Sequence, residues 1–392
     1  MKPRRIAIAT GTRADWGLLS TVASALRDSG KVEILVVATN MHLDSRRGNT
    51  IKEIANDGFE VATTVPMPVG EDTGAGVAKA MADCTRGFAE AFEKLNPDSL
   101  IILGDRYEML SVASVATVMR IPIIHIAGGE ISEGAIDDNI RHAITKLSSL
   151  HLTATENYRQ RIIAMGEQPD RVINTGAIGV YKIMNTPLMD KETLDRELGF
   201  KVDENTILVT LHPATAGNVS TPVMTGALLD ALSLFPDNNI LFTYPNNDAD
   251  GDIIIRMIEE YGSTNPERVR LVPSMGHIRY LSVLRYIAAV VGNSSSGIVE
   301  VPSIGIPVVN IRPRQNGRLV SEAVINADPD RDSIAEAIRF ALSGEGKEIA
   351  GKTPNPYFRE NTLGIMTDAI LSVSPENMKN KFFYDIEHPF IK

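Results

Sequence analysis

The chain has 392 residues, of which 43% are hydrophobic and 22% are charged, and its formal net charge is −10. This composition excludes disordered and fibrous proteins, and the length suits two domains of ordinary size. The single cysteine, Cys84, excludes an intramolecular disulfide and a zinc site built on several cysteines, which predicts a reducing, cytoplasmic location. The acidic balance argues against general binding to nucleic acid or to an anionic membrane, because such binding depends on neutralising phosphates.

Short apolar runs alternate along the chain with segments of helical periodicity, a pattern typical of parallel strands joined by crossover helices. No run approaches the roughly 20 apolar residues of a membrane-spanning helix, and the first one predicts a strand rather than a signal sequence. In the first half we expect strands at residues 6–10, 33–38, 99–103, 122–126, 150–153 and 172–175. In the second half we expect strands at residues 206–211, 239–244, 269–272, 288–291 and 307–311, followed by helices at residues 332–342 and 361–373.

The alternation lapses in a polar stretch at residues 185–196 and restarts at residue 206. We therefore predict an α/β protein with two Rossmann-like domains that face each other across a cleft, the first at residues 1–183 and the second at residues 184–360. Periodicity is compatible with either domain for the last helix. In open α/β sheets, ligands bind beyond the carboxyl ends of the strands, so side chains that directly follow a strand are the candidates for chemistry.

The first predicted strand runs into the sequence GTRADWG at the start of a helix. This arrangement can direct backbone N–H groups and the guanidinium of Arg13 at an anion. A capping box, in which Thr12 is the N-cap and Asp15 reaches back to it, explains Asp15 without a ligand. Arg13 is explained less easily in that way, since a cation in the first helical turn opposes the helix dipole unless an anionic partner is present.

Carboxylates follow two neighbouring strands of the first half. Asp105 comes directly after the strand at residues 99–103, and Glu130 ends the segment HIAGGE, whose glycines allow close approach of the backbone to a ligand. A helix then opens with the sequence DDNIRH, whose spacing places Asp137 beside Arg141. Acids are also favoured in the first turn of a helix for structural reasons alone, so a capping role is the alternative for each of them.

The second half contains a polar set typical of phosphate binding. One strand runs into the sequence GNSSSG, where serine hydroxyls and free N–H groups at a helix N-terminus can bind a pyrophosphate, and Glu300 follows within reach of ribose hydroxyls. His212 directly follows another strand, and the arginines of the loop at residues 312–318 suit phosphate oxygens. The structural alternatives are a serine-rich cap, a core histidine and a solvated basic loop. The candidate residues of the serine motif and the loop are Asn293, Ser294, Ser295, Ser296 and Arg318.

Taken together and in this order, the motifs resemble those of the hydrolysing UDP-N-acetylglucosamine 2-epimerases over about residues 6–320. They are GTRAD at residues 11–15, GDR at 104–106, GGE at 128–130 with DDNIRH at 137–142, HP at 212–213 and GNSSSG at 292–297. The resemblance implies the glycosyltransferase-B fold, in which the last helix crosses back to the first domain, so that residues 361–392 would complete that domain. It also implies homodimers or homotetramers.

The resemblance implies release of UDP and N-acetylmannosamine for sialic-acid-type sugar synthesis. UDP leaves C1 as a base removes the C2 proton, and water then adds to the resulting glycal with the opposite configuration at C2. No cofactor is needed, and neutralisation of the pyrophosphate by arginines makes a metal unnecessary. Asp105 and Asp137 match family acids implicated in proton transfer, and Arg141 matches a basic residue that orients them or contacts the substrate. The positions that match the family's UDP site are His212, Ser294, Ser295, Glu300 and Arg318. Arg13 is placed similarly in the first domain. The backbone around Pro273, Ser274 and Met275 would contact the uracil.

One position departs from the family pattern. Several members carry a glutamate directly before the Gly-Gly pair, where this chain has Ala127. One hypothesis is that Glu130 replaces it, and full turnover by Glu130→Gln would contradict that. The second hypothesis is that the change indicates a different sugar in the substrate. A small apolar residue at position 127 resembles the branch of the family that acts on UDP-N,N′-diacetylbacillosamine in legionaminic acid synthesis.

Three other functions remain open on this sequence. A glycosyltransferase of the same fold would release UDP only when an acceptor is present. A non-catalytic UDP-sugar sensor would bind without releasing UDP. A non-hydrolysing epimerase would form the epimeric UDP-sugar reversibly, although its histidine motif continues Glu-Ala-Gly where this chain has Ala127-Gly128-Gly129.

Overall fold

The computed structural model describes residues 3–44, 50–68, 70, 73–133, 135–213, 219–245, 250–273 and 275–386. The chain divides into two compact units. Unit 1 comprises Met1–Glu130, Ile136–Ile178 and Arg359–Lys392, and unit 2 comprises Ile131–Ala135 and Gly179–Phe358. The crossing after Ile178 lies a few residues before the boundary expected at residue 183.

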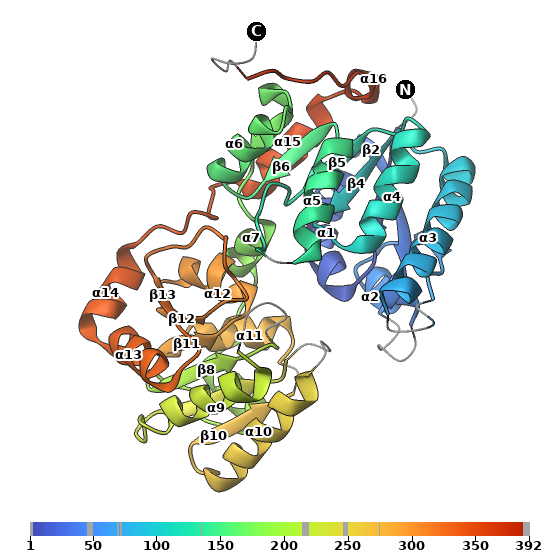
Figure 1. Cartoon of the computed structure of the whole chain (residues 1–392). Coiled ribbons are helices and arrows are strands. Elements are labelled where there is room, and N and C mark those ends of the chain that lie inside the picture. Colours follow the sequence, from blue (N-terminus) through green and yellow to red (C-terminus); the bar gives the residue numbers. More distant parts are fainter. Residues whose placement is uncertain are drawn as a thin grey trace. The chain divides into compact units, whose positions relative to one another are not determined.

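In the described part of unit 1, seven parallel strands form one sheet in the order β3-β2-β1-β4-β5-β6-β7 (Figure 1). The strand order reverses between β1 and β4, which makes the carboxyl ends of these two strands the topological switch point where ligands bind in such sheets. The strands are β1 (Arg4–Thr10), β2 (Val32–Thr39), β3 (Val61–Val65), β4 (Ser99–Leu103), β5 (Ile123–Ile126), β6 (Leu150–Thr153) and β7 (Val172–Asn174).

The helices of unit 1 cover both faces of this sheet, as the right-handed crossovers of a doubly wound fold require (Figure 1). Helices α3, α4 and α5 lie side by side, and α1 packs against α15. The helices are α1 (Arg13–Asp28), α2 (Ile51–Asn56), α3 (Gly74–Leu95), α4 (Tyr107–Val118), α5 (Ile136–Leu147), α6 (Glu156–Ala164), α15 (Thr362–Ser372) and α16 (Pro375–Lys379), with α7 (Ile178–Asn185) at the crossing to unit 2. None of the helices in the described ranges is long and apolar enough to cross a membrane.

The core of unit 1 lies between the sheet and helices α3, α4 and α5. The central strands are apolar on both faces because helices cover both, and Ile6 and Ile101 are fully buried. Phe88 and Phe92 of α3 pack edge to face with their ring centroids 5.4 Å apart. Cys84 lies in the same core, where burial raises the pKa of its thiol to about 12, so it is a packing residue and not a nucleophile.

Unit 2 repeats the architecture with six parallel strands in the order β10-β9-β8-β11-β12-β13 in its described part. Its switch point lies between β8 and β11. The strands are β8 (Thr206–Thr210), β9 (Asn239–Thr243), β10 (Val269–Val272), β11 (Ala289–Gly292), β12 (Val308–Ile311) and β13 (Val324–Ala327). The helices are α8 (Lys191–Leu198), α9 (Thr221–Leu232), α10 (Gly251–Thr264), α11 (His277–Leu284), α12 (Ser295–Val299), α13 (Arg331–Leu342) and α14 (Gly344–Lys352).

Strands β3 and β13 and helices α8, α14 and α16 were not expected from the sequence. Strands β3 and β13 are edge strands whose residues are only partly apolar and partly buried, so they lack the continuous apolar run of a central strand. Helix α8 lies in the polar stretch at residues 185–196 that we expected to be irregular. Asp190 caps it by accepting from the Thr193 N–H at 2.9 Å, and Gly199 ends it in the left-handed conformation.

Residues after α15 belong to unit 1 and are held there by polar contacts. Arg4 of β1 donates hydrogen bonds to the carbonyls of Ile370 and Val373 at 2.8 and 2.9 Å, which secures the last turn of α15. Beyond α16, Lys381 donates to the carbonyls of Lys146 and Ser148, both at 2.6 Å, at the C-terminal end of α5. The C-terminal segment therefore fixes the end of the helix that carries Asp137 and Arg141 in its first turns.

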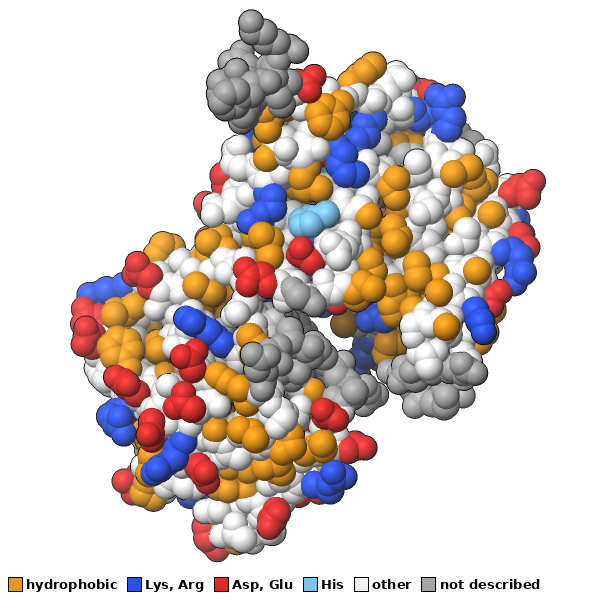
Figure 2. Space-filling view, in the orientation of Figure 1, with side chains coloured by type: hydrophobic (Ala, Val, Ile, Leu, Met, Phe, Trp, Pro, Cys, Tyr) orange, Lys and Arg blue, Asp and Glu red, His pale blue; other side chains and the backbone are white. Residues whose placement is uncertain are grey.

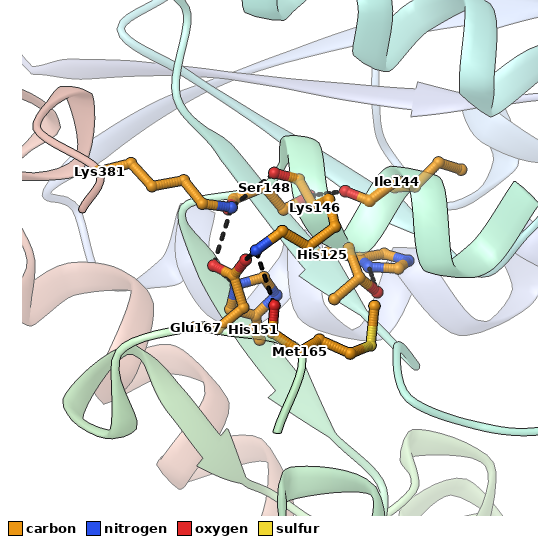
Figure 3. Close-up of polar contacts among 9 residues, drawn as sticks. His125, Ile144, Lys146, Ser148, His151, Met165, Glu167 and Lys381 are labelled. Carbon is orange, nitrogen blue, oxygen red and sulfur yellow. Dashed lines mark hydrogen bonds and ion pairs between the residues drawn. The ribbon is translucent and has the colours of Figure 1, made fainter. Parts of the chain in front are cut away.

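Three donors converge on the buried carboxylate of Glu167 (Figure 3). Lys146 contacts it at 2.5 Å, Lys381 at 2.8 Å and His151 at 3.2 Å. Burial opposes the charge of Glu167, but hydrogen bonds from His151, Lys146 and Lys381 outweigh burial and lower the pKa of Glu167 to about 2. This cluster joins β6, α5 and the C-terminal segment within unit 1.

Replacing Glu167 by Gln should lower the free energy of unfolding of unit 1 by about 3 kcal/mol at pH 7, because it removes the charge of a buried carboxylate that binds Lys146 and Lys381. The folded-state pKa of Glu167 lies below its ordinary value of 4.5, so its contribution is complete above about pH 4.5 and is lost as the pH falls toward 2. The difference in free energy of unfolding between wild type and variant should disappear as the pH falls from about 4.5 toward 2. Urea unfolding followed by the fluorescence of Trp16, the single tryptophan, measures it.

The matched control is Glu376→Gln, because Glu376 is 80% exposed in its ion pair with Lys379. This change should leave the unfolding midpoint unaltered. Equal stability of Glu167→Gln and wild type at pH 7 would contradict the structural role of the cluster.

Candidate active site

The loop after β4 places Asp105 at the switch point of unit 1. Gly104 has a φ of +74°, a left-handed conformation that favours glycine, and it turns the chain out of the strand. His125 on the neighbouring strand β5 donates from Nε2 to the Gly104 carbonyl at 2.8 Å. Burial lowers the pKa of His125 to about 3, so this histidine is neutral and acts as a fixed support for the Asp105 loop.

The guanidinium of Arg141 contacts two aspartates and a backbone carbonyl of unit 1. Arg141 lies on α5 and is only 2% exposed, yet it forms an ion pair with Asp105 from the loop after β4. It also contacts Asp138 of its own helix at 3.2 Å and donates to the backbone carbonyl of Glu130 at 3.0 Å. One buried cation thus joins three segments, as the planar fork of an arginine allows. The structure thereby brings Asp105, Arg141 and the Glu130 segment together.

Asp137 lies in the first turn of α5 beside this group. Burial and then the negative charge of Asp105 raise the pKa of Asp137, whereas the guanidiniums of Arg141 and Arg106 oppose that rise. The two acids therefore differ in environment: Asp105 is directly ion-paired, and Asp137 binds a proton more readily than an ordinary aspartate. Such a difference between neighbouring carboxyl groups is typical of an acid–base pair.

The glycines before Glu130 are required by close packing. A Cβ on Gly128 would lie 2.9 Å from Nδ1 of His125, and one on Gly129 would lie 2.7 Å from the Tyr158 carbonyl. Ala127 itself has a φ of +63°, an uncommon conformation for a residue with a side chain. Glu130 is 9% exposed, and its backbone carbonyl is the part that contacts Arg141. Replacement of the missing glutamate by the Glu130 side chain stays a hypothesis.

The helix start after β1 has the expected contacts between Thr12 and Asp15. Thr12 is the N-cap and accepts from the Asp15 N–H at 3.1 Å. The Asp15 oxygen Oδ2, however, is buried and has no hydrogen-bond partner among the described residues. Arg13 has an anionic partner within the protein, because it contacts Glu53 at 3.2 Å while 61% exposed. The capping role expected for Asp15 therefore agrees with its contacts to Thr12 and leaves one carboxyl oxygen unexplained.

In unit 2, His212 after β8 is fixed by Asn293 after β11. The His212 N–H donates to the Asn293 side-chain oxygen at 2.7 Å, and the Asn293 amide donates to the His212 carbonyl at 2.8 Å. Gln315 donates to the Asn293 carbonyl at 2.9 Å, which ties the arginine-bearing loop to the same point. The structure thus brings three of the motifs predicted from the sequence together at the switch point of this sheet.

The serine motif has two kinds of hydroxyl. Ser294 is the N-cap of α12 but makes no side-chain capping hydrogen bond, and Ser295 is exposed. Ser296 instead contacts the hydroxyl of Tyr280 at 2.9 Å. Burial raises the pKa of Glu300, opposed by its hydrogen bond with Ser296. Ser294 and Ser295 therefore stay candidates for phosphate contact, whereas Ser296 has a partner within the protein.

The remaining candidates of unit 2 are less well defined by their contacts. Met275 is 4% exposed, and its carbonyl accepts from Nε of Arg279 at 2.7 Å. Ser274 lies outside the described residues. The Arg318 N–H donates to the Gln315 carbonyl at 3.3 Å, which places Arg318 in the turn that Gln315 anchors. Among the described residues, no group of three or more His, Cys, Asp or Glu side chains could hold a metal ion.

Comparison with known proteins agrees with these motifs. The family model described as UDP-N-acetylglucosamine 2-epimerase matches residues 24–371. The chain belongs to this family, in its hydrolysing branch. A GDP/UDP-N,N′-diacetylbacillosamine 2-epimerase (hydrolyzing) of Campylobacter jejuni is 36% identical over 348 residues, which cover 89% of this chain and 90% of the relative. The polysialic acid biosynthesis protein P7 of Escherichia coli is 34% identical over 388 residues, or 98% of each chain.

Solved structures confirm the predicted fold. The Neisseria meningitidis UDP-GlcNAc 2-epimerase bound to UDP-GlcNAc matches with a TM-score of 0.72 at 16% identity, covering 94% of this chain and all of that one. The Acinetobacter baumannii MurG matches with a TM-score of 0.57 at 11% identity, covering 95% of this chain. Two Rossmann-like units of the glycosyltransferase-B type are therefore established. The chain is a hydrolysing UDP-sugar 2-epimerase, which removes the transferase, sensor and non-hydrolysing alternatives.

Replacing Asn293 by Ala in this epimerase should lower the free energy of unfolding of unit 2 by about 3 kcal/mol, because it leaves a buried N–H and a buried carbonyl of His212 without partners. Differential scanning calorimetry measures the loss. The exposed amide of Asn238, which bonds the Asn205 carbonyl at 2.9 Å, provides the control, and Asn238→Ala should change stability by less than about 0.5 kcal/mol. Equal effects of the two changes would show that Asn293 does not hold His212.

Proposed function

We propose that this epimerase converts UDP-N-acetylglucosamine and water into UDP and N-acetylmannosamine. The observation that carries the proposal is the ion pair of Asp105 with buried Arg141, beside the more readily protonated Asp137. The family model supports the substrate, since it is described as UDP-N-acetylglucosamine 2-epimerase. A Neisseria meningitidis protein of that name is 31% identical over 341 residues.

In the first step Asp105 acts as the base. The C2–H bond breaks, its electron pair forms the C1–C2 double bond, and the C1–O bond breaks with its electrons passing to the β-phosphate of UDP. The carbon acid is weak, so the base must be held within hydrogen-bonding distance, and Arg141 with the His125-supported loop provides that fixed position. A positioned base contributes a factor of about 10² to 10⁴ in rate.

In the second step the glycal is hydrated. C2 receives a proton from the face opposite to the one that lost it, and water forms a bond with C1. Asp137 is the proposed acid, because burial and the charge of Asp105 favour its protonated form. Inversion at C2 requires two different groups for removal and return of the proton, and the two acids meet that requirement.

The proposed UDP site lies on unit 2, at the switch point between β8 and β11. His212 is fixed there by Asn293, and the N-terminus of α12 presents Ser294 and Ser295. Helix N-termini and backbone N–H groups favour phosphate. Arg318 would add a cation, and the backbone at Met275 would contact the uracil. We propose Glu300, with its raised pKa, as a partner of the ribose hydroxyls.

A second substrate, UDP-N,N′-diacetylbacillosamine, is favoured by a specific observation. Two relatives named as 2-epimerases of this sugar nucleotide, from Campylobacter jejuni and Legionella pneumophila, are each 36% identical to this chain. Ala127, where other members carry glutamate, supports the same substrate, because a small apolar side chain leaves room for a different sugar.

Proton NMR in D₂O, with each nucleotide in a separate sample, tests the proposed function and separates the two substrates. We expect UDP and a free manno-configured sugar that carries deuterium at C2, because the proton returned to C2 comes from exchangeable acids. Asp105→Asn should reduce UDP release by about 10² or more. Asp28→Asn is the control, since Asp28 is 67% exposed. Binding of both nucleotides without UDP release would contradict the proposal.

We also propose that the chain forms a homodimer or homotetramer through α4 and its neighbour α3. Helix α4 is apolar around its whole circumference, which is typical of a helix covered on all sides. Its residue Val118 is nevertheless 84% exposed and Met119 is 37% exposed in the single chain. Figure 2 shows hydrophobic side chains gathered over this face of unit 1. A contiguous apolar patch of this kind marks an interaction surface.

Val118→Lys should dissociate the oligomer, because it places a charge in the apolar contact. Light scattering coupled to size exclusion measures the mass, and wild type should elute as two or four chains. Val223→Lys on α9 serves as the control, since Val223 is 61% exposed but lies on unit 2. A single-chain mass for wild type, or an unaltered mass for Val118→Lys, would contradict the proposed interface.

A further inference from the structure

The proposed reaction involves three proton transfers, whereas Asp105 and Asp137 provide two groups. One group removes the C2 proton, a second returns a proton to the other face of C2, and a third accepts the proton of the water that adds to C1. A glutamate that several family members carry is Ala127 here, so this chain has one carboxyl fewer beside β5. A further acid at the same edge of the sheet would complete the set.

Asp15 lies at that edge. It belongs to the first turn of α1, directly after β1, and Asp105 directly follows β4. Strands β1 and β4 are neighbours in the sheet, with Ile8 paired to Ile101. Both acids therefore extend from the switch point of one sheet, where ligands bind in this fold. Their charges are close enough that Asp105 raises the pKa of Asp15.

The hydrogen-bonding capacity of the Asp15 carboxyl is only partly satisfied by the described residues around it. Thr12 caps the helix by accepting from the Asp15 N–H, and the Asp15 carboxyl has a hydrogen bond with the Thr12 side chain. Its oxygen Oδ2 is buried and without a hydrogen-bond partner among the described residues. The neighbouring cation Arg106 is bound at 2.6 Å by Glu108, which is fully buried beneath Gly11. Arg106 is thus paired with Glu108 while its charge also acts on Asp15.

The charged groups that face Asp15 come from three elements. Burial raises its pKa most, Arg106 and the Thr12 hydroxyl oppose that rise, and Glu108 and Asp105 add to it, with the result near 6. A carboxyl with this pKa accepts a proton and releases it again near neutral pH, which is the property of an acid–base catalyst. The exposed N-cap carboxylates of Asp190 and Asp330 have lowered pKa values instead, because backbone hydrogen bonds outweigh their slight burial.

We propose that Asp15 is a third catalytic acid–base group of this epimerase and accepts the proton of the attacking water. As the O–H bond of water breaks, its proton passes to the Asp15 carboxylate and the water oxygen forms a bond with C1. The electron pair of the C1–C2 double bond takes the proton that Asp137 donates to C2. This assignment rests on the proposed function, since it places Asp15 in the hydration step of that reaction.

The test compares Asp15→Asn, Asp15→Glu and the control Asp28→Asn, which lies on the same helix but is 67% exposed. NMR follows UDP, the glycal and the free sugar separately. Asp15→Asn should slow formation of the free sugar by about 10² while UDP release continues, so the glycal accumulates. In wild type, the rate of free-sugar formation should fall as the pH drops below about 6, because a protonated Asp15 cannot accept a proton. This acidic limb of the pH–rate profile should be absent in Asp15→Asn. Asp15→Glu should restore part of the rate and the limb.

A wild-type ratio of glycal to sugar in Asp15→Asn, with the pH limb intact, would overturn the proposal. If Asp15→Asn does not fold, Asp15→Ser, which also removes the carboxyl, decides: accumulation of glycal supports the role, and an unaltered product ratio overturns it. A wild-type enzyme that releases no UDP from either nucleotide would contradict the proposed function itself. A wild-type enzyme that turns over while both Asp15 variants match it contradicts only the role of Asp15.

Discussion

The buried guanidinium of Arg141 is the interaction on which the active site of unit 1 depends. Removing a cation from water costs several kcal/mol unless it is paired and hydrogen-bonded. Arg141 meets this requirement through Asp105, Asp138 and the Glu130 carbonyl, which come from three separate segments. The same contacts that stabilise the buried charge therefore set the positions of the acids. Stability and catalytic geometry are linked in this site, because Asp105 cannot move without leaving Arg141 undercompensated.

Both units use the same property of a doubly wound sheet. The strand order reverses between β1 and β4 in unit 1 and between β8 and β11 in unit 2. Candidate side chains follow these four strands and the neighbouring strands β5 and β12. Unit 1 presents carboxylates there, whereas unit 2 presents hydroxyls, a histidine and helix N–H groups. This difference in chemical groups agrees with the proposed roles of the two units, in which unit 1 transfers protons and unit 2 binds the pyrophosphate.

The sequence predicted the central strands, and it placed most candidate residues directly after them, because both depend on local patterns. Apolar runs identify strands buried on both faces, and residues that follow them lie at the carboxyl edge. The edge strand β3, with the sequence VATTV, lacks such a run. Contacts between distant segments were not predictable: the pairing of Arg13 with Glu53 and the cluster around Glu167 depend on the folded chain. Asp15 shows a different limit, since a capping box and a functional acid use the same residue at the same position.

The activity of Arg141→Lys tests the account most directly. Lysine keeps the charge but has no planar fork, so it cannot hold Asp105, Asp138 and the Glu130 carbonyl at once. Steady-state UDP release should fall by about 10² or more, as expected for acids displaced by roughly 1 Å, in protein whose Trp16 fluorescence still shows cooperative unfolding. An unchanged kcat in that folded variant would contradict the account, because it would show that Arg141 does not position the acids.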